Sequence, residues 1–201
     1  MFIVFDGIDG CGKTTQIFRL SEHLSSLSKY AHILITREAY KDRKIREVLR
    51  QIESKDKFET LTKLFVEDRK EHIKELILPS LKKDVIVISA RYKYSTIAFQ
   101  AAEGKDMREL VRLHENMPVP DFTFIMDVPS EIAFNRIHKR DTRVKIPGSN
   151  KFEEDISFLE KVRKNYLKMP EIFPNEKIII MDGSKSVEEI FDEIKKYFPK
   201  V

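Results

Sequence analysis

The sequence predicts an α/β protein built on a five-stranded parallel sheet with helices on both faces. Five short apolar segments alternate with segments whose apolar residues recur at helical spacing. A glycine-rich segment follows the first apolar segment directly and leads into the first helical one. Apolar strands separated by helices are typical of a parallel sheet that is covered on both faces.

The expected strands are short apolar segments, and the expected helices carry an apolar face that can pack on a sheet. The strands are Phe2–Phe5, His32–Thr36, Val85–Ser89, Phe122–Met126 and Lys177–Met181. The helices are Thr14–Ser28, Ile45–Ile52, Glu59–Leu81, Ser95–Gln100, Met107–Asn116, Glu131–Lys139, Glu154–Met169 and Val187–Tyr197. In such a sheet ligands bind at the carboxyl ends of the strands.

The composition fits one compact enzyme domain over residues 1–201, with 41% hydrophobic residues to form the core. No apolar segment approaches the roughly 18 residues that a membrane-spanning helix needs, so we expect no membrane partner. The 37 basic and 33 acidic residues are interleaved along most of the chain without an aromatic-rich basic stripe, so we expect no nucleic-acid partner. The only cysteine, Cys11, cannot form an internal disulfide, which is consistent with a cytoplasmic protein.

The glycine-rich segment has the pattern G-x-x-x-x-G-K-T, which is typical of a phosphate-binding loop. Its glycines let backbone N–H groups turn toward a phosphate, and the helix that follows directs its positive end there. Lys13 can reach the terminal phosphates of a nucleotide, and Thr14 can hold Mg²⁺. The candidate phosphate-binding residues are Gly7, Ile8, Asp9, Gly10, Cys11, Gly12, Lys13, Thr14 and Thr15. We interpret Cys11 as a small residue that fits the loop, with a redox role as the alternative.

Charged residues also follow the other expected strands. Arg37 follows the second strand, Arg91 the third and Asp127 the fourth. Two arginines beside a phosphate loop indicate a second anionic ligand that faces the nucleotide. This arrangement favours a kinase of small phosphorylated acceptors over a hydrolase.

Further motifs occur in a fixed order over nearly the whole chain. They are Gly7–Gln16, Thr36–Glu38, Leu64–His72, Arg91–Gln100, Asp127–Pro129, Phe158–Tyr166 and a final Asp182. In this order the motifs resemble those of thymidylate kinases. The resemblance implies a P-loop kinase fold, a three-layer sandwich with a mobile lid, that transfers a phosphoryl group from ATP to dTMP with the help of Mg²⁺. It also implies a role in dTTP synthesis and a homodimer.

The resemblance also implies which residues bind dTMP. They are Asp9, Arg37, Phe65, Arg69, Arg91, Ser95, Thr96, Phe99 and Gln100. Phe65 and Arg69 are four residues apart and share a helix face, which would present a ring for a pyrimidine beside a cation. Core packing is the alternative for Phe65. By the resemblance, Arg37 and Arg91 grip the acceptor phosphate, and Phe99 disfavours a ribose 2′-hydroxyl.

A basic stretch follows the fourth expected strand, with six Lys/Arg against two Asp/Glu between Ser130 and Lys151. Phosphoryl transfer needs positive charge around the transferring group, and a closing segment can supply it. Some thymidylate kinases carry an arginine in the phosphate loop, where this chain has Gly10 and Cys11, so we expect the charge to come from a lid over residues 139–152. A solvated basic face is the alternative. The candidate catalytic residues are Lys13, Asp9, Arg91, Arg140 and Arg143.

Two departures from the family pattern affect the expected activity. Ala90 stands where relatives carry an aspartate that the resemblance associates with Mg²⁺ or proton handling. We therefore expect a slower enzyme, or one in which Asp9, Glu38 or a water compensates. Residues Ala39–Arg43 replace a Pro-Gly-Gly-Thr turn beside the acceptor. The alternatives are a kinase of broader pyrimidine range that accepts dUMP and a nucleotide-binding protein with weak or lost catalysis. An NTPase that acts on nucleic acid is a third alternative, which no motif favours.

Overall fold

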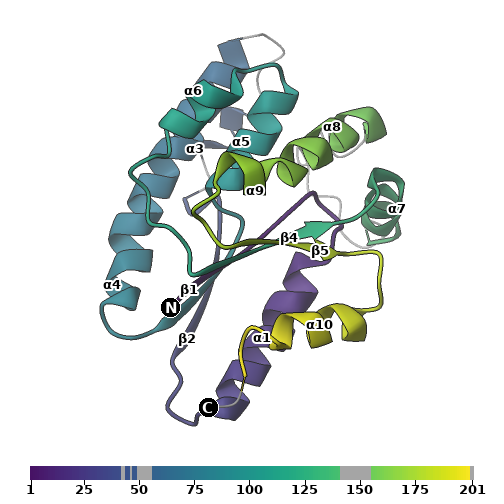
Figure 1. The fold of residues 1–201 in the computed structure, drawn as a ribbon. Helices are drawn as coiled ribbons and strands as arrows, with labels where there is room; N and C mark the ends of the chain where they lie inside the picture. The colour runs from purple at the N-terminus through teal and green to yellow at the C-terminus, as the bar shows by residue number, and fades with distance from the viewer. Residues whose placement is uncertain (42–43, 46, 49–55, 141–154, 200–201) are drawn as a thin grey trace.

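The computed structural model describes residues 1–41, 44–45, 47–48, 56–140 and 155–199. Five strands form one parallel sheet in the order β2-β3-β1-β4-β5 (Figure 1). The strands are β1 (Phe2–Asp6), β2 (Ile33–Arg37), β3 (Ile86–Ala90), β4 (Phe122–Asp127) and β5 (Ile178–Asp182). The predicted five-stranded parallel sheet is confirmed. Each strand ends one residue later than predicted, because the residue that follows each apolar segment still pairs with a neighbouring strand.

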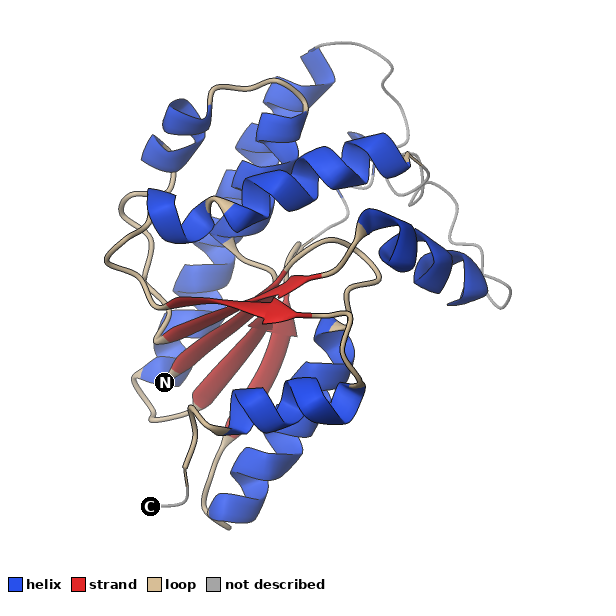
Figure 2. Ribbon diagram, turned by 45° about the vertical axis from the view of Figure 1, so that its right-hand side comes forward, coloured by secondary structure: helices blue, strands red, loops and turns tan. Residues whose placement is uncertain are grey.

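Helices lie on both faces of the sheet, as predicted (Figure 2). One face carries α1 (Lys13–Leu27) and α10 (Val187–Lys195), which pack against each other. On the other side lie α3 (Asp56–His72), the π-helix η1 (Ile73–Ile77), α4 (Leu78–Leu81), α5 (Lys93–Ala102), α6 (Met107–Arg112), α7 (Ser130–Arg140), α8 (Ile156–Leu167) and α9 (Met169–Ile172).

Several predicted helix bounds differ from the observed ones, and three of these differences are informative. The long helix predicted over Glu59–Leu81 contains one π-helical turn, η1, between α3 and α4. The helix predicted over Met107–Asn116 ends at Arg112. The helix predicted from Glu154 begins at Ile156, because the Asp155 side chain accepts hydrogen bonds from the backbone N–H groups that start α8. The predicted helix Ile45–Ile52 and the predicted lid over residues 139–152 lie largely outside the described residues.

The position of β1 explains where the site forms. All five residues of β1 are buried, and the strand lies between β3 and β4 at the centre of the sheet. Phe5 of β1 stacks on Phe124 of β4 with ring centroids 5.1 Å apart. The loop after β1 therefore emerges at the middle of the carboxyl edge, where the ends of the neighbouring strands surround it.

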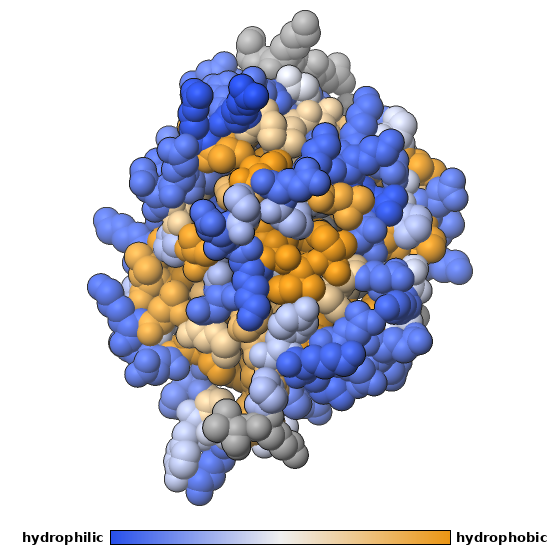
Figure 3. All heavy atoms as spheres, in the orientation of Figure 1, coloured by the Kyte–Doolittle hydropathy of each residue, from blue (hydrophilic) through white to orange (hydrophobic). Residues whose placement is uncertain are grey.

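The surface carries a mixture of side chains. Hydrophilic side chains are spread over the face shown in Figure 3, and hydrophobic ones gather near its centre. Among the described residues, no helix is both long enough and apolar enough to cross a membrane. Pairing of two copies of the chain stays a prediction from the resemblance.

Candidate active site

The phosphate loop between β1 and α1 has a backbone that only glycine adopts easily. Gly7 has φ 133° and Gly10 has φ 79°. A Cβ on Gly7 would lie 2.7 Å from the Met126 carbonyl oxygen, and one on Gly10 would lie 2.4 Å from the Ala133 carbonyl oxygen. The two glycines therefore let the loop pack directly against the end of β4 and the beginning of α7.

The start of α1 is prepared for an anion. The helix begins at Lys13, and its N-cap residue Gly12 provides no side chain to cap it. The first backbone N–H groups of a helix have no partner within the helix, and the helix dipole makes this end positive. A phosphate group is a ligand that satisfies these groups. The side chains of Thr14 and Thr15 are exposed at the same end.

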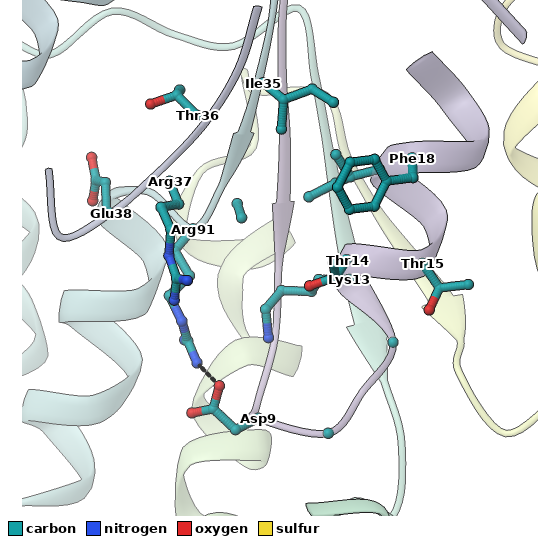
Figure 4. Close-up of a pocket in the computed structure, with 14 residues that line it drawn as sticks. Asp9, Lys13, Thr14, Thr15, Phe18, Ile35, Thr36, Arg37, Glu38 and Arg91 are labelled. Carbon is teal, nitrogen blue, oxygen red and sulfur yellow. Dashed lines mark hydrogen bonds and ion pairs between the residues drawn. The ribbon is translucent and has the colours of Figure 1, made fainter. Parts of the chain in front are cut away.

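A cavity of about 450 Å³ opens beside the loop (Figure 4). It is lined by Asp9, Gly10, Gly12, Lys13, Thr14, Thr15, Ile17, Phe18, Ile35, Thr36, Arg37, Glu38, Ala90 and Arg91. The structure thus brings the ends of β2 and β3 to the phosphate loop, with three cationic side chains, Lys13, Arg37 and Arg91, around one space. Ile35 and Phe18 form an apolar wall of the same cavity.

The charged groups of the loop are paired within the protein. The Lys13 ammonium donates hydrogen bonds to the carbonyl oxygens of Gly7 and Ile8, both at 2.9 Å. Arg91 Nη2 donates to Asp9 Oδ1 at 2.5 Å (Figure 4). Burial would raise the pKa of Asp9, but Arg91, Lys13 and Arg37 together lower it below its ordinary value. Asp9 is therefore ionised at neutral pH and fixes Arg91 beside the loop.

Arg91 is held in an unusual backbone conformation at the end of β3. Its φ is 75°, a value that few residues other than glycine adopt. Its guanidinium carbon lies 5.4 Å from the centre of the Phe99 ring, and its Nη1 donates to Ser95 Oγ at 3.1 Å. Ser95 and Phe99 of α5 are only partly buried. Three of the predicted acceptor-binding residues, Arg91, Ser95 and Phe99, therefore lie together.

The remaining predicted acceptor residues lie deeper between α3 and α5. Thr96 and Gln100 are buried; Thr96 Oγ1 accepts from Arg69 at 3.0 Å, and Gln100 Oε1 accepts from Thr62 at 2.7 Å. Phe65 is partly buried on α3. None of these side chains lines the cavity beside the phosphate loop. Their direct contacts with a nucleotide stay predictions.

Arg69 is more extensively bonded within the protein than the other predicted acceptor residues. Its side chain is buried and forms a bidentate ion pair with Glu38, in which Nε lies 2.9 Å from Oε1 and 2.7 Å from Oε2. Nη1 bonds to His114 Nε2 at 2.8 Å, and Nη2 donates to Thr96 and to the Tyr92 carbonyl oxygen. All three nitrogens are therefore satisfied by the protein. In this structure Arg69 connects the end of β2 to α3 and α5, and its contact with dTMP stays a prediction.

The same network fixes the protonation of His114. Because an arginine can only donate, Nε2 of His114 is the acceptor, so Nδ1 carries the proton and donates to the Leu110 carbonyl oxygen at 2.7 Å. Burial and the neighbouring Arg69 lower the pKa of His114 to about 4. His114 is therefore neutral in the folded protein above that pH.

The lowered pKa of His114 predicts a loss of stability in mild acid. Between the ordinary histidine pKa of about 6.5 and the folded value, the unfolded chain takes up a proton that the folded protein does not, so stability falls as the pH falls. We expect His114 to reduce the free energy of unfolding by about 2 kcal/mol from pH 7 to pH 5. Urea unfolding of the wild type and of His114→Gln at both pH values measures this.

The glutamine side chain keeps one donor and one acceptor but does not titrate, so His114→Gln should lose about 2 kcal/mol less stability than the wild type over this interval. The exposed His138 provides the control, since His138→Gln should keep the wild-type dependence. The buried Glu38 also has a lowered pKa: burial would raise it, but Arg69 and His72 lower it. The stability that the ionised Glu38 contributes is lost only as the pH falls below the ordinary pKa range of glutamate. Equal pH dependence in all three proteins would contradict the prediction.

The predicted lid arginines have different positions. Arg140 is the last residue of α7, and Arg143 lies outside the described residues. Arg136, also on α7, donates from Nη1 to the Gly183 carbonyl oxygen at 3.2 Å. Gly183 lies near the phosphate loop, because a Cβ on it would be 3.3 Å from the Cys11 carbonyl oxygen. Helix α7 thus extends from the loop toward the basic segment, and the catalytic roles of Arg140 and Arg143 stay predictions.

Sequence reasoning gave no specific role to Asp6 or Tyr166, and it gave Glu38 only as a group that could compensate for the missing aspartate. Asp6 is a fully buried carboxylate at the end of β1, and Tyr166 Oη donates to its Oδ1 at 2.7 Å from α8. Glu38 lines the cavity while it pairs with Arg69. Asp6 could have been found from the sequence, because it directly follows the apolar segment Phe2–Phe5. A carboxylate at that place must find partners inside the protein.

The donor groups at the cavity agree with a Mg²⁺ ion that is bound mainly through the nucleotide. Thr14 offers an exposed hydroxyl at the start of α1. The nearby carboxylates of Asp9 and Glu38 are engaged by Arg91 and Arg69, and Asp127 is engaged by Arg163 at 2.6 Å. No group of three metal-binding side chains occurs in the part of the chain that the structure describes. Mg²⁺ often binds through few protein ligands and several phosphate oxygens and waters, which fits this donor set.

The parallel sheet, the glycine loop on an uncapped helix and the cationic cavity together define a P-loop nucleotide kinase. The family model for thymidylate kinase matches residues 5–194. The chain belongs to the thymidylate kinase family, whose members phosphorylate dTMP.

Individual relatives agree with this assignment over almost the full length. A probable thymidylate kinase of Pyrococcus horikoshii is 36% identical over 201 residues, which cover 96% of this chain and 93% of that protein. A thymidylate kinase of Thermosipho africanus is 35% identical over 210 residues, covering 100% of this chain and 98% of the relative. The crystal structure of thymidylate kinase from Ehrlichia chaffeensis is similar with a TM-score of 0.76 and 28% identity, over 99% of this chain and 98% of that one.

Proposed function

We propose that this protein transfers the γ-phosphoryl group of ATP to dTMP, giving ADP and dTDP for the synthesis of dTTP. One observation supports this more than any other. Lys13, Arg37 and Arg91 line the same cavity as the uncapped start of α1. These fixed positive charges can offset the repulsion between two phosphorylated ligands that meet in the cavity.

The residues divide into a donor side and an acceptor side. The loop N–H groups, Lys13 and the start of α1 hold the donor phosphates, and Arg37 and Arg91 hold the acceptor phosphate. Arg37 is exposed at the end of β2 and forms no ion pair with another described residue, so its guanidinium is available to an anion. Asp9 keeps Arg91 directed toward the loop through their ion pair.

The reaction needs little proton transfer. An acceptor phosphate has a second pKa of about 6, so at neutral pH it is mostly a dianion. One of its oxygens attacks the γ-phosphorus of ATP while the bond between that phosphorus and the β–γ bridging oxygen breaks, and ADP leaves. Mg²⁺, when bound with Thr14 and the phosphates, neutralises part of the charge that develops. The protein residues position the two nucleotides and exclude water from the transferring group.

Ala90 provides no carboxylate at the cavity, and its two carboxylate neighbours there are already engaged in ion pairs. Asp9 is paired with Arg91, and Glu38 is buried and paired with Arg69. Ala90 itself lines the cavity at the end of β3. A carboxylate introduced at position 90, opposite Arg37 in the sheet, would therefore add a negative group to the cavity that the two paired carboxylates do not supply.

We expect Ala90→Asp to increase kcat with dTMP about tenfold, which equals about 1.4 kcal/mol of transition-state stabilisation. The new carboxylate adds a metal-side contact, so the Mg²⁺ concentration for half-maximal activity should also fall. Steady-state kinetics over a range of MgCl₂ concentrations measures both effects. Ala90→Asn is the matched control, because it has the same shape without the charge and should give no gain. An unchanged or lower kcat for Ala90→Asp would contradict this account of the missing aspartate.

The chain segment after β2 fixes one border of the cavity. The backbone N–H groups of Tyr40 and Lys41 donate to the two carboxylate oxygens of Asp68 on α3, at 2.7 and 2.6 Å. The Tyr40 ring stacks on His72 with centroids 4.7 Å apart. These contacts hold the start of the segment that replaces the Pro-Gly-Gly-Thr turn of relatives. The acceptor range is therefore the property to test first.

A coupled assay with MgATP and a panel of dTMP, dUMP, dCMP, UMP and dGMP tests the proposal, with Lys13→Ala as the blank. Turnover of dTMP that is absent from the blank supports it. Comparable turnover of dUMP would support the kinase of broader pyrimidine range. Binding of ATP and dTMP without any product would support a nucleotide-binding protein that has lost catalysis.

A further inference from the structure

The Asp6 carboxylate is the centre of a buried hydrogen-bond network beneath the site. It is fully buried at the end of β1. Its Oδ1 accepts from Ser95 Oγ at 2.6 Å, from Tyr166 Oη at 2.7 Å and from the Gly7 backbone N–H at 3.0 Å. Its Oδ2 accepts from the Tyr92 backbone N–H at 3.0 Å. One side chain thus connects the phosphate loop, the beginning of α5 and helix α8.

The protons of this network can be assigned from chemistry. Ser95 Oγ and Tyr166 Oη lie 2.9 Å apart, but Asp6 Oδ1 is nearer to each of them, at 2.6 and 2.7 Å. A carboxylate oxygen is also a stronger acceptor than a hydroxyl, so both hydroxyl protons point to Asp6. Burial and the nearby Asp6 raise the pKa of Tyr166 well above its ordinary value, so its hydroxyl keeps the proton. The lone pairs of both hydroxyls are then free to accept from another donor.

That donor is Arg91. Its Nη1 lies 3.1 Å from Ser95 Oγ and 3.5 Å from Tyr166 Oη. An arginine has donors only, so it needs neighbours that present lone pairs. Asp6 creates this situation, because it takes the protons of both hydroxyls. The other side of the guanidinium is held by Asp9, so Arg91 is fixed from two directions.

We propose that Asp6 is a positioning residue that acts through Ser95 and Tyr166 to fix the Arg91 guanidinium toward the acceptor phosphate. The inference rests on the proposed function, in which Arg91 holds that phosphate. Ser95, which the resemblance placed among the dTMP-binding residues, then has its proton committed to Asp6 and accepts from Arg91. Charged hydrogen-bond networks of this kind can contribute more than single bonds suggest.

Tyr166→Phe tests the inference with a single lost hydroxyl. The ring stays, and one of the two side-chain acceptors opposite Nη1 is removed. We expect KM for dTMP to rise about tenfold, as the loss of a hydrogen bond to a charged group predicts, with KM for ATP unchanged. Tyr94→Phe is the matched control, because Tyr94 is also buried, and its hydroxyl bonds to Glu176 and Thr123 instead of Asp6. This control should lower the melting temperature without changing KM for dTMP.

A second experiment shows whether Tyr166 acts through Arg91. In the Arg91→Ala background, Tyr166→Phe should leave kcat/KM for dTMP unchanged, since the group that it positions is gone. The same tenfold loss in both backgrounds would mean that Tyr166 contacts the substrate itself, which would overturn the inference. Ser95→Ala should also raise KM for dTMP, and Ser95→Thr, which keeps a hydroxyl, should restore much of it.

Asp6→Asn changes the central carboxylate itself. If the Asp6→Asn variant does not fold, the Tyr166 and Ser95 variants serve as the test. Calorimetric binding of dTMP separates the inference from the proposed function. Tight binding and turnover in the wild type, with unchanged binding in Tyr166→Phe, would overturn the inference alone. A wild type that binds dTMP without turnover, and a tenfold weaker Tyr166→Phe, would overturn the catalytic function and support the positioning role. A wild type that does not bind dTMP would overturn both.

Discussion

Replacing Lys13 with alanine is expected to lower kcat for dTMP phosphorylation by on the order of 10³-fold, the scale of a lost cationic group in phosphoryl transfer. Lys13 is the lysine that lines the cavity, and its ammonium lies 2.9 Å from two carbonyl oxygens of the phosphate loop. Its charge is available where negative charge develops on the transferring group. The coupled assay at saturating MgATP and dTMP measures the change.

Two further measurements separate this catalytic loss from unfolding. A melting curve measures any loss of stability separately, because the alanine leaves the buried carbonyl oxygens of Gly7 and Ile8 without their Lys13 donor. Lys195→Ala is the control, since Lys195 lies on α10 with an exposed ion pair to Asp192 and should keep full activity. More than a tenth of wild-type activity in Lys13→Ala would contradict the assignment of Lys13 to the phosphates.

Replacing Arg91 with alanine is expected to lower kcat/KM for dTMP by about 10²- to 10³-fold, as for the loss of a preorganised charge beside the reacting group. The effect on KM for ATP should be small, because Arg91 belongs to the acceptor side of the cavity. Asp9 would also lose its ion-pair partner. Initial-rate kinetics with each substrate varied in turn distinguishes the two sides.

The backbone of Arg91 needs its own control. A φ of 75° strains arginine and alanine in the same way, so Arg91→Ala leaves the backbone strain at this position unchanged. Arg91→Lys keeps the charge but loses the two-sided contact of the guanidinium with Asp9 and Ser95, so we expect an intermediate loss. Arg19→Ala, which removes an exposed arginine paired with Glu188, should leave the kinetics unchanged. Equal losses of dTMP and ATP affinity in Arg91→Ala would contradict the division into two sides.

The fold was predictable because its signals are local. The apolar segments give the strands, and the spacing of Ile17, Leu20 and Leu24 gives a helix face whose residues are in fact buried. The loop from Gly7 to Thr14 also has a local pattern, and its position over the central strand follows from the sheet. The π-helical turn Ile73–Ile77 was missed, because one short π-helical turn leaves the spacing of the apolar residues nearly unchanged.

The acceptor side was less predictable because its contacts depend on distant partners. The spacing of Phe65 and Arg69 shows that they share a helix face, but it does not show that Glu38 is buried against that face. Asp6 is 89 residues from Ser95 and 160 residues from Tyr166. No periodic pattern connects residues so far apart, so this network needed the three-dimensional structure.

The separation of Asp6 from Tyr166 also has a consequence for synthesis of the chain. At about 5–20 residues per second, the ribosome makes Tyr166 roughly 10–30 seconds after Asp6. Until then the Asp6 carboxylate lacks one of its hydroxyl partners, and the centre of the sheet cannot enclose it without an energetic cost. We therefore expect Asp6 to stay more accessible to water while the earlier part of the chain is made, and the acceptor side to become complete only when helix α8 has left the ribosome.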